Sequence, residues 1–85
     1  MAEVEIGKVN KFFDKIGVGM IQVTTGELAV GDTIHIKGNS TDLTATISSM
    51  QVHRQPVQTA KTGDEAGIKL ESKVRPNDKV FKVTA

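Results

Sequence analysis

The sequence contains no cysteine, no tryptophan and no tyrosine, and it has only three phenylalanines and two prolines among 85 residues. Without cysteine, neither a disulfide framework nor a thiolate metal site is available. No apolar stretch approaches the roughly 20 residues that a membrane helix needs. The acidic start of the chain, Met1-Ala2-Glu3-Val4-Glu5, lacks the pattern of a secretory signal. These absences predict a single cytoplasmic domain over residues 1–85 with no membrane partner.

The charge of the chain is nearly balanced, with 11 Lys and Arg residues against 10 Asp and Glu residues. A net charge of +1 does not by itself indicate a nucleic-acid partner. The two halves differ, because residues 1–42 have a net charge of −2 and residues 43–85 a net charge of +3. No acidic residue lies between Asp42 and Asp64. This stretch is either an ordinary solvated face or an edge that faces an anion.

Three dipeptides of one kind each introduce a short alternating apolar run: Gly31-Asp32, Gly63-Asp64 and Asn77-Asp78. Gly and Asn tolerate the positive φ that a tight turn needs, and the Asp side chain can accept the free N–H of the turn. The alternating run that follows each turn is typical of a strand with one buried face. The sequence is therefore organised as turns and strands, as in a small β-barrel or sandwich.

Six strands are predicted from these patterns, at residues 4–13, 16–24, 33–37, 43–52, 65–70 and 79–83. No window of eleven or more residues has a helical stripe. In the third strand Ile34 and Ile36 are expected to point inward, with His35 and Lys37 outward. Ala66, Ile68 and Leu70 are expected inward on the fifth strand.

Irregularities are predicted at three places. Gly7 lies where the apolar parity of the first strand changes, which favours a β-bulge. A bulge or bend is expected at Ser48-Ser49, and Pro56 is expected to interrupt the ladder because it lacks an N–H donor.

The phenylalanines Phe12 and Phe13 must face opposite ways in an alternating strand. We expect Phe13, Phe81 and Val83 in the core. Phe12 is then either a cover over the barrel end or a contact for a partner.

Residues for catalysis are not apparent in the sequence. No Gly-rich phosphate loop followed by Lys and Ser or Thr is present, so GTP binding is not expected. His35 and His53 are interpreted as solvated surface residues, and we expect no metal site, no cofactor and no catalytic residue. The chain is therefore predicted not to be an enzyme.

Blocks along most of the chain resemble the second domain of translational GTPases such as elongation factor Tu. The matching blocks run over residues 7–9, 26–34, 49–52, 57–68 and 77–80. The sequence is similar also to small archaeal proteins described as elongation-factor-like, and to the barrel at the C-terminus of some collagenase-type peptidases. The Phe12-Phe13 hairpin is the feature associated with these variants. The resemblance implies an all-β, closed, six-stranded antiparallel β-barrel of Greek-key type.

Two functions follow as hypotheses. The first is a translation-related module that docks on structured RNA, such as tRNA, rRNA or the ribosome, through phosphate contacts. Its candidate contacts are cationic residues on one side of the barrel: Lys37, His53, Arg54, Lys61, Lys69, Lys73 and Arg75. The alternative is a protein-interaction accessory for a peptidase-like or other multi-subunit partner, with Phe12, Met20 and the loop at residues 38–42 as its contact surface.

Overall fold

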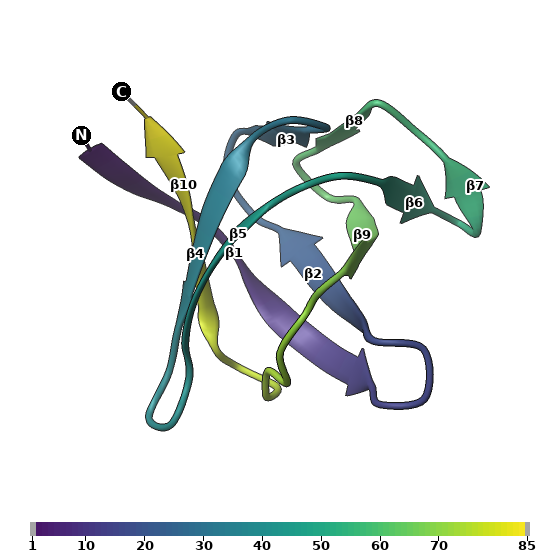
Figure 1. Ribbon diagram of the computed structural model, residues 1–85. Helices are drawn as coiled ribbons and strands as arrows, with labels where there is room; N and C mark the ends of the chain where they lie inside the picture. The colour runs from purple at the N-terminus through teal and green to yellow at the C-terminus, as the bar shows by residue number, and fades with distance from the viewer. Residues whose placement is uncertain (1, 85) are drawn as a thin grey trace.

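The computed structural model describes residues 2–84, and throughout this range the regular structure consists of β-strands (Figure 1). Ten strands are present among the described residues: β1 (Ala2–Phe13), β2 (Val18–Val23), β3 (Glu27–Ala29), β4 (Thr33–Lys37), β5 (Asp42–Thr46), β6 (Met50–Val52), β7 (Gln55–Pro56), β8 (Thr59–Lys61), β9 (Glu65–Lys69) and β10 (Lys79–Thr84). Eight of them form one sheet in the order β5-β4-β10-β1-β2-β9-β6-β7, and β3 and β8 form a second. Every pairing between them is antiparallel. The predicted all-β antiparallel class is confirmed.

The predicted closure with six strands differs from the observed pairing. Within residues 2–84 the large sheet has two edge strands, β5 and β7, which do not pair with each other. The sheet is strongly curved, and the chain runs directly from the edge strand β5 to β6, the neighbour of the other edge strand β7, through only residues 47–49 (Figure 1). The β3–β8 pair lies near this junction, and the backbone N–H of Gly31, just after β3, donates to the carbonyl of Ile47 at 2.8 Å.

The additional strands are short elements that alternation cannot detect. The bend predicted at Ser48 is present and divides the expected strand at residues 43–52 into β5 and β6. Pro56 does not remove the chain from the sheet, because β7 is an edge strand and its outer side needs no N–H donor. Pro56 thus lies where the ladder ends.

The three predicted turns share one geometry. Gly31, Gly63 and Asn77 have φ values of 98°, 95° and 73°. In each turn the Asp N–H donates to the carbonyl three residues earlier, as in Asp64 to Lys61 at 2.9 Å. The Asp carboxylate accepts the N–H of that same earlier residue, at 2.8 Å for Asp32, 2.9 Å for Asp64 and 3.0 Å for Asp78. The predicted turn chemistry is confirmed at all three sites.

The core lies inside the curved sheet, and among the described residues its buried members are aliphatic side chains and Met50. Ile34, Ile47 and Ile68 are at most 1% exposed, and Ala66 and Leu70 are also buried, as predicted. Leu28 and Ala60 bring the small β3–β8 sheet into the same cluster. Each strand of the large sheet therefore buries mainly the side chains of one of its two faces.

The assignment of Phe13 to the core was wrong, whereas Phe12 packs against the core, in agreement with its predicted role as a cover. The bulge predicted at Gly7 is present in the pairing with β10. A second register shift lies between Val9 and Lys11 in the pairing with β2. It reverses the parity, so that Phe12 packs against the core whereas Phe13 is 42% exposed.

The inward face of β10 was also misassigned. Val80 is fully buried, whereas Phe81 and Val83 are only half-buried. Phe81 is paired with Glu5 on one side and His35 on the other, so it belongs to the outer face of the sheet. Because apolar residues point to both faces of β10, the register of β10 with β1 and β4 decides which face is buried.

Candidate functional site

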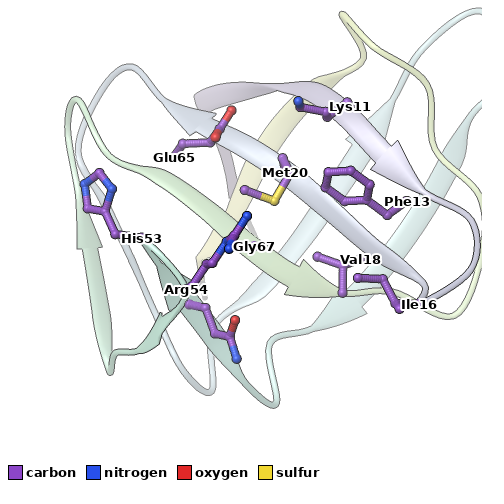
Figure 2. A pocket seen from close by; sticks show the side chains of 10 residues that line it. Lys11, Phe13, Ile16, Val18, Met20, His53, Arg54, Glu65 and Gly67 are labelled. Carbon is purple, nitrogen blue, oxygen red and sulfur yellow. The ribbon is translucent and has the colours of Figure 1, made fainter.

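A groove of about 490 Å³ lies on the outer face of the large sheet (Figure 2). It crosses β1, the turn after it, β2, β9 and the β6–β7 hairpin. Ten residues line it: Lys11, Phe13, Ile16, Val18, Met20, Gln51, His53, Arg54, Glu65 and Gly67.

One half of the groove is an apolar surface. The outward parity of β2 supplies Val18 and Met20, which are half-buried, and the hairpin from β1 to β2 supplies Phe13 and Ile16. Phe13 is 42% exposed and Ile16 is 62% exposed. Figure 2 shows Met20 in the middle of the group, with Phe13, Val18 and Ile16 on one side and His53 on the other. Contiguous exposed apolar side chains of this kind are typical of interaction sites.

Gly67 lines the groove and has no side chain that would fill it. It lies inside β9, where it is paired with Met20 on β2 and with Gln51 on β6. A Cβ added at this position would lie 3.3 Å from the Met20 sulfur and 3.5 Å from Val18 Cγ1, inside the groove. A glycine within a strand weakens it and marks a close approach of other atoms. Any residue larger than glycine would therefore occupy the space that the groove leaves open.

The cationic wall comes from the tight β6–β7 turn. Val52 and Gln55 are paired, so His53 and Arg54 alone form the loop. Both have positive φ, 52° and 64°, as in a type I′ hairpin turn. Asn-Gly is the usual sequence for this turn, because other side chains are strained there. Backbone strain of this kind is concentrated at functional sites, and here it places two basic side chains beside the apolar surface.

A fixed carboxylate lies on the same side of the groove as the β6–β7 turn, because Glu65 adjoins Ala66, which is paired with Val52 (Figure 2). Asn10, at the second bulge of β1, donates from Nδ2 to Glu65 Oε2 at 2.7 Å. The Lys11 Nζ lies 5.6 Å from the centre of the Phe13 ring, within the range of a cation–π contact. The groove thus combines an apolar half with the charged side chains of Lys11, Arg54 and Glu65.

The residues proposed from the sequence are distributed over several surfaces. Met20, His53 and Arg54 line the groove, whereas Phe12 does not. Lys37 and Arg75 line a second hollow formed by the β4–β5 loop and the turn before β10. Lys61, Lys69 and Lys73 are exposed and line neither. Gly67 was not predicted as a groove residue, because strands that are distant in the sequence form the groove.

His35 is not the freely solvated residue that was predicted. Its side chain points outward but is only 15% exposed, and its ring lies 2.8 Å from Glu3 Oε2 and 2.5 Å from Asp42 Oδ1. The hydrogen bond to Asp42, followed by that to Glu3, raises the pKa of His35 above its ordinary value. The same bond lowers the pKa of Asp42. This cluster links β1, β4 and β5, although β10 lies between β1 and β4.

In residues 2–84, no three His, Cys, Asp or Glu side chains are grouped so that they could hold a metal ion. The same range contains no helix of the length and apolarity required to cross a bilayer.

The family model for elongation factor Tu domain 2 matches residues 17–77 of the chain. The chain therefore belongs to the elongation factor Tu domain 2 family, as the sequence blocks predicted.

Curated relatives come from peptidases. An uncharacterized protease of Methanocaldococcus jannaschii is 38% identical over 80 residues, which are 93% of this chain and 19% of the relative. A collagenase of Porphyromonas gingivalis is 32% identical over 81 residues, 94% of this chain and 20% of the relative. The chain thus spans about a fifth of the length of these relatives.

Among solved structures, the fold is similar to the C-terminal domain of a Geobacillus thermoleovorans protein assigned to the U32 peptidases. The TM-score is 0.86 at 15% identity, with 95% of this chain and 93% of that chain covered. At this identity the likeness establishes the fold alone.

Proposed function

We propose that the chain is a non-catalytic docking module that binds a peptidase-type protein partner through the groove around Met20. The proposal rests chiefly on the exposed apolar surface of Phe13, Ile16, Val18 and Met20. It is supported by the curated relatives, in which a matching segment is about a fifth of a much longer protease or collagenase. The partner in this proposal corresponds to the other four fifths of such a protein.

The shape of the groove favours an apolar segment as the bound element. Burying the exposed parts of Phe13 and Ile16 removes apolar surface from water at about 25 cal/mol per Å². The open floor at Gly67 lets a side chain of the partner approach the sheet backbone. Association of this kind depends little on salt, unlike binding to RNA phosphates.

Binding can be measured by calorimetry between this chain and the part of the M. jannaschii protease that lies outside the matched segment. Ile16→Ser removes the most exposed of the groove's apolar side chains and is expected to weaken binding about tenfold. Val4→Ser is the matched control, because Val4 is 50% exposed but does not line the groove. The expected signature includes a negative heat-capacity change and little change between low and high salt.

Translation-related RNA docking, the first of the two sequence hypotheses, is tested in parallel with tRNA at two salt concentrations. Binding of tRNA without binding of the protease fragment would contradict the proposal. If Ile16→Ser and Val4→Ser weakened binding equally, the groove would not be the surface that binds the partner.

A further inference from the structure

Three lysines stand side by side across neighbouring strands. Lys79 on β10 is paired directly with Lys8 on β1 and with Lys37 on β4. Residues that are directly opposite in antiparallel strands point to the same face of the sheet. Because Val9, Ile36 and Val80 point into the core, the three lysines point to solvent, and all three are exposed. We call Lys8, Lys79 and Lys37 the lysine row.

Like charges in directly opposite positions destabilise a sheet. Within residues 2–84 the ion pairs involve His35, with Glu3 and Asp42, and Lys82, with Asp32, so none neutralises the lysine row. Asp42 is opposite Lys37 and attracts it, but its hydrogen bond goes to the His35 ring. The row is thus a concentration of positive charge in which Asp42 offsets part of the charge of Lys37, and no ion pair of the described residues reaches Lys8 or Lys79.

A hollow of about 460 Å³ adjoins one end of the row. Lys37, Lys79 and Arg75 line it together with polar groups of Asn39, Ser40 and Asn77. Its one acidic residue, Asp78, is only 6% exposed, and its Oδ2 accepts the Arg75 N–H at 3.0 Å. Three cations and three neutral polar side chains that can donate hydrogen bonds therefore line the hollow, together with the buried Asp78.

We propose that the lysine row and this hollow bind a ligand that carries consecutive phosphate groups. The row extends over two strand spacings, roughly 10 Å. Acidic side chains on one face of an extended peptide recur only about every 6.6 Å and carry one charge each. The directly linked phosphates of a polyphosphate chain supply more negative charge over this length, and Lys binds phosphate as a point charge without a required bidentate geometry. This site is separate from the groove around Met20 and does not depend on the proposed function.

The test compares thermal unfolding in sodium tripolyphosphate and in sodium chloride of equal ionic strength. A ligand that binds only the folded state raises the midpoint temperature, so tripolyphosphate is expected to raise it by several degrees above the chloride value. Lys79→Gln, in the middle of the row, is expected to lose at least half of this shift. Lys69→Gln is the matched control, since it removes one exposed strand lysine outside the row and should retain the shift.

A uridine hexanucleotide and a hexaglutamate peptide distinguish the sources of the anion. Stabilisation by the hexanucleotide that Lys79→Gln reduces would assign the site to a nucleic-acid backbone. A response to tripolyphosphate alone would assign it to a free polyphosphate. The proposal is overturned if neither phosphate ligand stabilises the protein beyond chloride, if both variants lose the shift equally, or if hexaglutamate is as effective.

Discussion

The Oδ2 atom of Asp78 accepts a hydrogen bond from the backbone N–H of Arg75 at 3.0 Å, while the Asp78 N–H donates to the Arg75 carbonyl at 3.2 Å. The same reciprocal pair joins Asp64 with Lys61 and Asp32 with Ala29. These hydrogen bonds fix the backbone of each turn immediately before the next strand begins.

Replacing these carboxylates is expected to lower the free energy of unfolding unequally. Asp64→Ala removes a hydrogen bond of a partly exposed turn and should cost about 1 kcal/mol. Asp78→Ala should cost about 2 kcal/mol, because Asp78 is buried and its loss leaves the Arg75 N–H without its acceptor. Urea unfolding measures both, with the exposed Asp14→Ala as control. Equal costs for Asp78→Ala and Asp14→Ala would show that the turn bond does not stabilise the fold.

The second bulge of β1 predicts different roles for the two adjacent phenylalanines. Phe12→Ala should destabilise the protein by about 2 kcal/mol, since its ring packs against the core. Phe13→Ala should change the free energy of unfolding by less than about 0.5 kcal/mol, because its ring is on the solvent side. Chemical denaturation of both variants checks this pair. A larger effect of Phe13→Ala would mean that the parity of β1 is the one first expected from the sequence.

Relieving the strain in the His53-Arg54 turn is expected to raise the stability of the protein and to weaken its binding to the partner. The double change His53→Asn with Arg54→Gly installs the preferred type I′ sequence and should raise the free energy of unfolding by about 1 kcal/mol. It also removes the His53 and Arg54 side chains that line the groove, so less surface is buried and binding of the protease fragment should weaken. Thermal unfolding and calorimetry on the same sample measure the two effects. A loss of stability would show that the turn is not strained in the way described.

The cluster of His35, Glu3 and Asp42 predicts a pH dependence of stability. The raised pKa of His35 means that its contribution is fully present below the unfolded-state value near 6.5 and is lost as the pH rises through the folded-state pKa. The lowered pKa of Asp42 means that its contribution is present above about pH 4 and is lost as the pH falls through its folded-state pKa. The cluster therefore stabilises most between about pH 4 and pH 6.5.

The difference in melting temperature between the wild type and His35→Gln should be largest in that window and decrease in alkaline buffer. His53→Gln serves as control, because it removes an imidazole from a different hairpin. A difference that stays constant from pH 5 to pH 9 would contradict the assigned role of the His35 hydrogen bonds.

Interactions close in the sequence were predictable, and those that depend on strand register were not. The alternation of β4 and β9 and the bulge at Gly7 could be predicted, because each follows from the order of small, polar and apolar residues. The second bulge of β1 was not readable, so the sequence could not assign Phe12 and Phe13. The two-residue turn at His53-Arg54 was not predicted either, since these residues are not those that the turn prefers.

The sequence by itself determined three of the turns and which short segments alternate, because the positive φ at Gly31, Gly63 and Asn77 and the bonds of the following Asp side chains involve only four residues each. Only the tertiary structure decided that Met20 and Gly67 share a groove and that Lys8, Lys79 and Lys37 stand in one row. Those surfaces depend on the register between strands up to some seventy residues apart, which is set by how all the apolar faces fill one interior.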